Sequence, residues 1–149
     1  MAFRGVNTIN LDGKGRFSFP TKYRADLKEH CDCKLVITAN REGCLVVYPL
    51  PLWEQVEESL TKLPPLNKSA MRLKRFILGH ASQCDLDGHG RILLPEKLRE
   101  FAKLDKRLVL CSLVDRFEIW AEELWEDNVD AWIEDDSEDL KEITRDLVL

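Results

Sequence analysis

The chain contains two copies of one sequence unit, and this internal repeat constrains its fold more than any other feature. Residues 11–24 read LDGKGRFSFPTKYR and residues 86–99 read LDGHGRILLPEKLR, with eight of fourteen positions identical at a shift of 75 residues. A second match, at a shift of 72, relates CLVVYPLPLWE at 44–54 to RFEIWAEELWE at 116–126. Each copy is therefore one supersecondary unit. Neither copy, at about 75 residues or fewer, is expected to hold much core alone, so the two are predicted to share one.

The start of the first copy predicts a strand, a tight turn and a second strand. Residues 7–11 alternate between polar and apolar, and Phe17 and Phe19 alternate again after the glycine-bearing stretch 12–15. Such a pattern around an Asp-Gly dipeptide is typical of a turn between two strands. The same pattern at 86–94 predicts a second turn of this kind.

Proline is favoured at the first position of a helix, so Pro20 predicts a short helix over residues 20–29. The spacing of its apolar residues directs Tyr23 and Leu27 inward. Its basic side chains are expected to point outward: Lys22, Arg24 and Lys28.

The remaining elements follow from periodicity, prolines and capping residues. They are a hairpin over 35–48, a helix over 52–62, a helix over 70–81 capped by Asn67 or Ser69, an acidic helix over 122–134, and a loose end at 138–149. The predicted fold class is α+β, a pseudo-symmetric β domain with surrounding helices. Its segments are a first repeat (1–63), a connecting basic helix (64–81), a second repeat (82–134) and an acidic C-terminal tail (135–149).

Charge is distributed unevenly along the chain. The 22 basic and 27 acidic residues give a net charge of −5. Residues 115–149 hold fourteen acidic and three basic residues, a net of −11, so residues 1–114 carry +6. A basic body with an acidic tail points to contact with nucleic acid or to self-association.

The sequence argues against several functional classes. No apolar run approaches the ~20 residues of a membrane helix, and residues 1–11 lack the apolar region of a secretory signal, so we expect a cytoplasmic protein without membrane contact. Five cysteines without a CxxC pair predict free thiols, and Cys31 and Cys33 beside His30 lack a second pair of zinc ligands. Neither His80 nor His89 has a recognisable nucleophile partner, so no catalytic residue, cofactor, metal or small-molecule substrate is expected.

The duplicated Asp-Gly-x-Gly-Arg admits three interpretations. In the first it is a turn, in which glycines take positive φ without cost and Asp12 pairs with Arg16 only to hold the loop. In the second, residues 85–96 form a calcium loop of the EF-hand type, with Glu96 at its twelfth position. The first copy argues against calcium, because Lys14 puts an ammonium group where an oxygen ligand belongs.

In the third interpretation the turns bind DNA. Exposed Lys14 with Arg16, and His89 with Arg91, offer base contacts, since an arginine fork can bond guanine O6 and N7. The residues expected to orient these side chains are Asp12, Gly13, Gly15, Asp87, Gly88 and Gly90. The residues expected to contact phosphate and set the register are Arg4, Lys22, Arg24, Lys97 and Arg99. A structural protein without specific DNA binding is the alternative.

These motifs resemble a known bacterial family. The repeated L-D-G-x-G-R-x-x-x-P-x-K-x-R, the stretch GHASQCDLDGHGR at 79–91 and CLVVYPLPLWE are similar to the MraZ proteins, over essentially the whole chain. The family signature Asp-x-x-x-Arg falls on Asp12 with Arg16 and on Asp87 with Arg91.

The resemblance implies more than the residues alone. It implies the fold of the AbrB/SpoVT DNA-binding domains, in which swapped hairpins from two copies interlock into a small β-barrel, with both copies in one chain. It also implies a homo-oligomeric ring that binds double-stranded DNA at promoter repeats. In this reading the protein is a nucleoid-associated transcriptional regulator of its own cell-division and cell-wall gene cluster.

Overall fold

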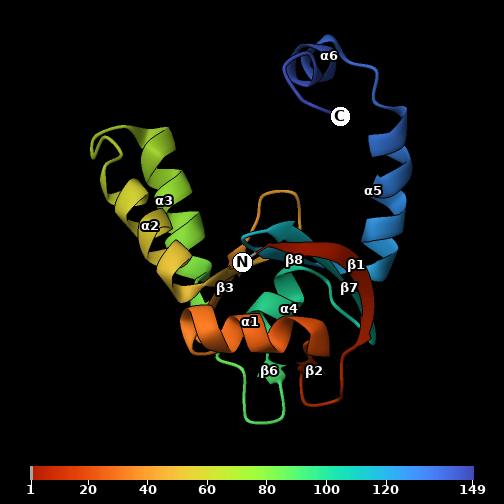
Figure 1. The fold of residues 1–149 in the computed structure, drawn as a ribbon. Helices are drawn as coiled ribbons and strands as arrows, with labels where there is room; N and C mark the ends of the chain where they lie inside the picture. Colours follow the sequence, from red (N-terminus) through yellow and green to blue (C-terminus); the bar gives the residue numbers. More distant parts are fainter. Residues whose placement is uncertain (1) are drawn as a thin grey trace.

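The computed structural model describes residues 2–149, and within them it contains eight strands and six helices (Figure 1). The strands are β1 (Phe3–Asn10), β2 (Arg16–Ser18), β3 (Leu35–Ala39), β4 (Leu45–Pro49), β5 (Ser82–Gln83), β6 (Arg91–Leu93), β7 (Arg107–Val114) and β8 (Phe117–Ala121). The helices are α1 (Thr21–Cys31), α2 (Leu50–Thr61), α3 (Lys68–His80), α4 (Glu96–Phe101), α5 (Glu122–Glu134) and α6 (Glu138–Thr144). The expected mixture of helices and antiparallel strands is confirmed.

The two copies are joined through one antiparallel sheet. Its strand order is β1-β7-β8-β4-β3-β5, so β4 and β8, which are equivalent in the two repeats, lie together in the middle. Strand β1 of the first copy pairs with β7 of the second, while β5 of the second pairs with β3 of the first. Each copy therefore completes the sheet of the other. Within the described residues no ladder joins β1 to β5, so closure of the sheet into a barrel is not confirmed.

A separate two-stranded ribbon, β2 with β6, also crosses between the copies. The predicted turn after β1 is present, but β1 and β2, the strands on either side of it, do not form a ladder with each other. Instead Phe17 pairs with Ile92, and both side chains are buried, while their neighbours on the opposite face of the ribbon are exposed or half-exposed. Burial of the two apolar side chains against the shared core explains this pairing.

The core contains residues of both copies, as the shared-core prediction requires. Phe3 and Phe19 from the first copy contact Phe117 from the second, with ring centroids 4.5 and 4.9 Å away. The hydroxyl of Ser112 donates to the Tyr23 hydroxyl at 2.8 Å, and that hydroxyl donates to the backbone of the first strand. A smaller cluster around Trp120 lies under helix α5.

The four predicted helices are present as α1, α2, α3 and α5, each within two residues of its predicted bounds, and the structure differs from the prediction in two details. The Asn67 side chain caps α3, as predicted, by accepting from the amide of Ala70 at 2.9 Å. Arg24 does not extend outward from α1, because its Nε donates to the Phe19 carbonyl at 2.9 Å and the side chain is half-buried. The tail expected to be loose includes helix α6, which the Ser137 hydroxyl caps. No helix in residues 2–149 combines the length and hydrophobicity needed to span a membrane.

Candidate nucleic-acid interface

The first glycine-bearing turn is held by a single carboxylate. Asp12 Oδ1 accepts from the backbone amides of Lys14 at 2.9 Å and Arg16 at 2.8 Å, and Oδ2 accepts from Arg16 Nε at 3.1 Å. The backbone closes the same turn, with the Asp12 amide donating to the Arg16 carbonyl at 2.8 Å. These bonds all lie within five residues, so the turn is specified locally.

The second turn repeats this geometry. Asp87 Oδ1 accepts from the amides of His89 at 2.8 Å and Arg91 at 2.9 Å, and Oδ2 accepts from Arg91 Nε at 3.1 Å. The substitution of histidine for lysine between the two glycines leaves the turn unchanged, because that position contributes only its backbone. The two turns therefore hold equivalent arginines with the same hydrogen bonds, Arg16 beside Lys14 and Arg91 beside His89.

Hydrogen bonding lowers the pKa of both carboxyl groups. For Asp12 the largest cause is the backbone amide of Arg16, followed by the amide of Lys14 and the Arg16 side chain, and desolvation opposes them. For Asp87 the corresponding groups of Arg91 and His89 lower the pKa in the same order. Both carboxylates are therefore ionised at neutral pH and hold the arginine through Nε. The terminal guanidinium nitrogens of both arginines make no hydrogen bond within residues 2–149.

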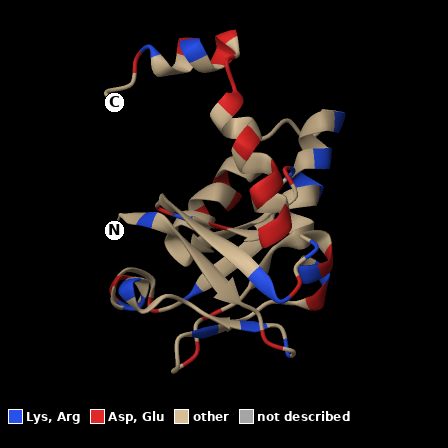
Figure 2. Ribbon diagram, turned by 90° about the vertical axis from the view of Figure 1, so that its right-hand side faces the viewer, with Lys and Arg blue, Asp and Glu red and all other residues tan. Residues whose placement is uncertain are grey.

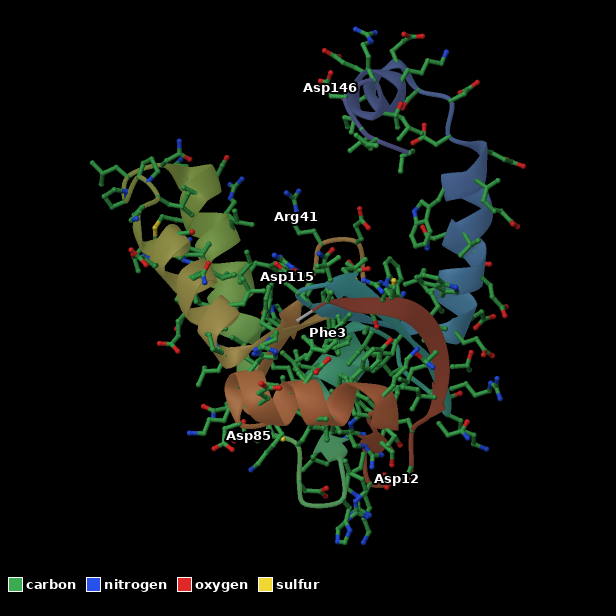
Figure 3. All side chains as sticks on the ribbon, in the orientation of Figure 1. Phe3, Asp12, Arg41, Asp85, Asp115 and Asp146 are labelled. Carbon is green, nitrogen blue, oxygen red and sulfur yellow. The ribbon has the colours of Figure 1, made fainter. Side chains whose placement is uncertain are left out.

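The ribbon places the two arginines on one exposed face. Arg16 pairs with Leu93 and Arg91 pairs with Ser18, so all four side chains share the face opposite the buried Phe17–Ile92 pair. The two arginines are diagonal neighbours, about 7–8 Å apart at the backbone. In Figures 2 and 3 the turns project from one end of the molecule, and Figure 3 places Asp146, in the tail, at the other end.

The glycines of each turn have two different roles. Gly15 and Gly90 adopt φ of +84° and +74°, which only glycine takes freely, and both are buried. Gly13 and Gly88 are exposed, with nothing within 4 Å of an added Cβ atom. The first pair therefore shapes the turn, and the second pair leaves open backbone that a ligand can approach.

The residues expected to contact phosphate do not form one group. Lys22 and Lys97 are exposed near the starts of the equivalent helices α1 and α4, and Lys97 Nζ donates to the Gly79 carbonyl at 3.1 Å. Arg24 and its equivalent Arg99 are half-buried beside the turns, with Nε bonded to backbone carbonyls.

Arg4 lies near the start of β1, six residues before the end from which the first turn begins, which is roughly 20 Å of extended strand. The structure therefore separates Arg4 from the turns. Phosphate contact by any of these residues stays a prediction.

The structure does not bring together the ligand sets that the sequence suggested for calcium or zinc within residues 2–149. Asp87, the third residue of the calcium pattern, uses both carboxylate oxygens in the turn, and Glu96 is the first residue of α4. His30 lies with Asp26 and Glu29 on α1, where the ligand atoms are within 4.8 Å of one another, and the cluster includes neither nearby cysteine.

Two features of the interface were not expected from the sequence. The first is the outward position of Ser18 and Leu93 between the arginines, where Leu93 is 56% exposed. The second is that an arginine of the other copy contacts each buried glycine: Arg99 lies against Gly15, and Arg24 lies against Gly90. The alternation around Phe17 contained the signal for the first. For the second feature the sequence offers only the repeat spacing of 75 residues, and this spacing does not indicate which copy a side chain contacts.

Comparison with known proteins agrees with the repeat. The chain matches the family model described as "MraZ protein, putative antitoxin-like" over residues 2–76 and again over residues 77–147. A curated relative named "Transcriptional regulator MraZ" from Methylococcus capsulatus is 51% identical over 135 residues, which is 91% of this chain and 89% of that protein. The protein of the same name from Nitrosococcus oceani is 46% identical over 148 residues, which is 99% of this chain and 97% of that protein. With two matches to the family model and relatives this similar along nearly the whole chain, the protein belongs to the MraZ family.

Proposed function

We propose that the protein is a sequence-specific regulator that binds double-stranded DNA through its two glycine-bearing turns. The observation that carries the proposal is the duplicated turn, in which an ionised aspartate holds the arginine by Nε and leaves its terminal nitrogens without a partner in residues 2–149. The curated relatives are named transcriptional regulators, which supports the same function. This function implies that the protein is located in the cytoplasm and associated with the nucleoid.

In this proposal Arg16 and Arg91 read guanine in the major groove. A two-stranded ribbon is narrow enough to enter that groove, and the arginine terminal nitrogens match guanine O6 and N7. Lys14 and His89, at the tips of the turns, contact a neighbouring base or phosphate. The exposed Leu93, opposite Arg16 on the ribbon, is suited to a thymine methyl group.

The surrounding cations position the ribbon. Exposed Lys22 and Lys97 neutralise phosphates beyond the segment that the turns contact, which makes binding dependent on salt. The resemblance to the family supports promoter repeats upstream of a cell-division and cell-wall gene cluster as the target. The exchanged strands β1 and β5 support a swapped-hairpin arrangement of the AbrB/SpoVT type.

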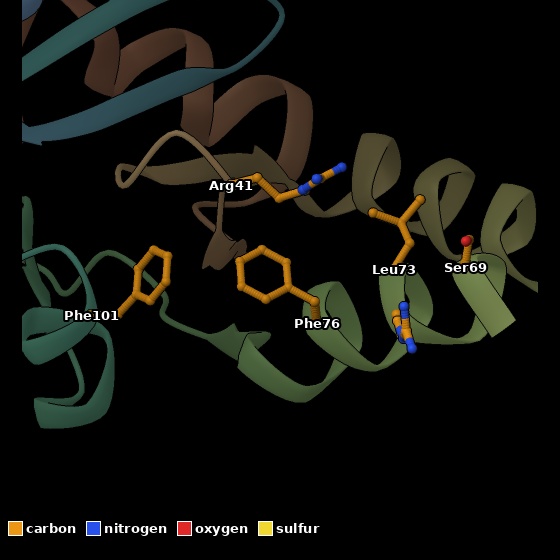
Figure 4. Close-up of a pocket in the computed structure, with 6 residues that line it drawn as sticks. Arg41, Ser69, Leu73, Phe76 and Phe101 are labelled. Carbon is orange, nitrogen blue, oxygen red and sulfur yellow. The ribbon is translucent and has the colours of Figure 1, made fainter.

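We propose further that copies of the chain assemble head to tail into a ring. Helix α3 carries four basic and no acidic residues and buries no side chain fully. Its residues Leu73 and Phe76 line a pocket of about 560 Å³ together with Arg41 and Phe101 (Figure 4). Helices α5 and α6 are acidic and expose Trp132, Ile133 and Ile143.

Figure 1 draws α3 and α5 on the same face of the sheet, near its two opposite edges. A contact between α3 of one copy and the tail of the next therefore uses two different surfaces, and such a contact forms a ring when the rotation closes. The charges of the two surfaces are complementary. The tail in that arrangement remains at the end away from the turns.

The first experiment measures binding of the purified protein to labelled DNA from upstream of its own gene. Arg16→Ala is expected to lose roughly 1–3 kcal/mol of specific binding, and Arg91→Ala the same or less, because each removes one bidentate guanine contact. Lys62→Ala removes an exposed cation that pairs with Glu58 on α2, and serves as the charge-matched control. If both arginine variants stay folded and bind like the wild type, the protein does not bind through these turns.

The second experiment tests the assembly. A fragment with three repeats is expected to bind far more tightly than one with a single repeat, because every contact after the first is intramolecular. Insertion of half a helical turn between repeats is expected to remove most of this gain. Mass photometry of the free protein reports the oligomer directly. A monomer, or equal affinity for one and three repeats, contradicts the ring, and a ring without specific DNA binding favours the structural alternative.

A further inference from the structure

We infer that Arg24 and Arg99 are positioning residues that each support the DNA-facing turn of the other repeat. The inference rests on the proposed function of the turns, and it assigns these arginines a role other than phosphate contact. In this arrangement the order of each turn depends on an arginine of the other repeat, although each turn is closed by its own aspartate.

Arg99, on α4 of the second copy, supports the turn of the first copy. A Cβ atom added to Gly15 would lie 2.7 Å from Arg99 Nε and 2.8 Å from Cζ, so the guanidinium lies directly against this glycine. The same Nε donates to the Leu94 carbonyl at 3.0 Å, and the Leu94 amide donates to the Gly15 carbonyl at 2.9 Å. A continuous chain of contacts thus runs from the arginine to the turn. Lys14 and Arg99 also line one surface pocket.

Arg24, on α1 of the first copy, supports the turn of the second copy in the same way. A Cβ atom on Gly90 would overlap the guanidinium, with Arg24 Nε and Cζ as its nearest neighbours. Arg24 Nε donates to the Phe19 carbonyl at 2.9 Å, and the Phe19 amide donates to the Gly90 carbonyl at 2.8 Å. Arg24 also shares a pocket with His89, at the tip of that turn.

This reciprocity explains why the buried glycines occur where they do. Gly15 and Gly90 leave the space that a planar guanidinium fills, and their positive φ turns the chain over it. A lysine supplies a charge and a donor, but not the flat group that lies against the backbone. Since Nε is committed to a carbonyl and the side chain is half-buried, support of the turn is the role that this geometry favours.

A consequence for DNA binding follows. Loss of Arg24 is expected to loosen the turn that carries Arg91, and loss of Arg99 the turn that carries Arg16. Affinity is then lost because the arginine that contacts guanine is poorly ordered in the free protein and must become ordered on binding, which costs free energy. It does not come from a lost phosphate contact, so the dependence of affinity on salt is expected to keep its slope.

Hydrogen–deuterium exchange of the full-length protein, read by mass spectrometry, tests the crossing directly without DNA. In Arg24→Ala, the amides of residues 88–91 are expected to exchange at least roughly tenfold faster, the change that loss of one charge-assisted hydrogen bond corresponds to. Residues 13–16 are expected to exchange as in the wild type. Arg99→Ala is expected to give the reverse pattern. Exchange that increases in the arginine's own repeat, in both turns equally, or in neither turn overturns the inference.

The charge-conserving variants Arg24→Lys and Arg99→Lys separate positioning from phosphate contact in a DNA-binding assay. We expect each to lose affinity as the alanine variant does, while the slope against salt stays that of the wild type. Wild-type affinity in the lysine variants overturns the inference, because charge alone would then suffice. The lysine variants also carry the exchange test if an alanine variant fails to fold. Failure of the proposed function is distinguishable, since it appears as unchanged binding in Arg16→Ala whatever the exchange pattern is.

Discussion

Substitution of Gly15 by alanine is expected to destabilise the protein in two ways, one of which depends on Arg99, a residue of the other repeat. The new Cβ atom would lie 2.7 Å from Arg99 Nε, closer than side-chain carbons approach other atoms in proteins. It would also force an L residue to adopt φ of +84°. The first cost depends on Arg99 and the second does not, so a double-mutant cycle separates them.

The magnitude follows from these two costs. Left-handed backbone costs about 1–2 kcal/mol for a residue other than glycine. Displacement of the Arg99 guanidinium, whose Nε is bonded to the Leu94 carbonyl, costs up to about 3 kcal/mol more. We therefore expect Gly15→Ala to lower the free energy of unfolding by about 2–5 kcal/mol in the wild type, and by about 1–2 kcal/mol in an Arg99→Ala background. The coupling free energy between the two substitutions is thus about 1–3 kcal/mol.

The assay is urea unfolding of the four proteins of the cycle at one protein concentration, since assembly makes stability depend on concentration. Gly13→Ala is the matched control, because Gly13 lies in the same turn, outside the left-handed region, with nothing within 4 Å of an added Cβ atom. A second cycle pairs Gly15→Ala with Arg24→Ala and is expected to be additive within about 0.5 kcal/mol. Additivity with Arg99, or coupling to Arg24 instead, would refute the crossed arrangement.

Three further predictions concern acid stability, the core and salt. Because hydrogen bonding lowers the pKa of Asp12 and Asp87 in the folded protein, their contribution to stability is present above the unfolded pKa and lost as pH falls through the folded pKa. Urea unfolding below about pH 4 should therefore show a steeper loss in the wild type than in the double Asp→Asn variant, and equal slopes would contradict this account. Trp120→Ala, at a side chain only 1% exposed, is expected to cost about 3–5 kcal/mol in the same assay, and a loss below 1 kcal/mol would place that side chain outside the core. Lys22→Ala and Lys97→Ala should each flatten the slope of log affinity against log salt by about one unit, whereas an unchanged slope would show that these lysines face away from DNA.

The local parts of the site could be predicted from the sequence because their interactions span few residues. Asp12, the glycines that follow it and Arg16 form a turn whose side-chain hydrogen bonds reach at most four positions along the chain. The cap of α3 at Asn67 reaches three. Residue type and spacing are sufficient for such features, since the chain has few other ways to satisfy these groups.

The repeat also indicated that the copies share a core, since a unit of this size buries little apolar surface alone. Repetition does not reveal which copy a strand joins. A pairing of β2 within its own copy and a pairing of β2 with the other copy can both direct Phe17 inward, so both fit the alternation around Phe17. Burial of apolar side chains over the whole core favours the pairing between copies, in which Phe17 lies opposite Ile92.

The tertiary structure alone decided the role of the two helix arginines. Arg24 is a basic residue on a surface helix, and its sequence neighbours predict an outward side chain. Its actual partners are the carbonyl of Phe19 and the backbone of Gly90, which come together only after β2 and β6 have paired. The sequence by itself determined the two turns, because their hydrogen bonds are local. How the turns support each other depends on contacts between distant segments, whose register is set only when the shared core is packed.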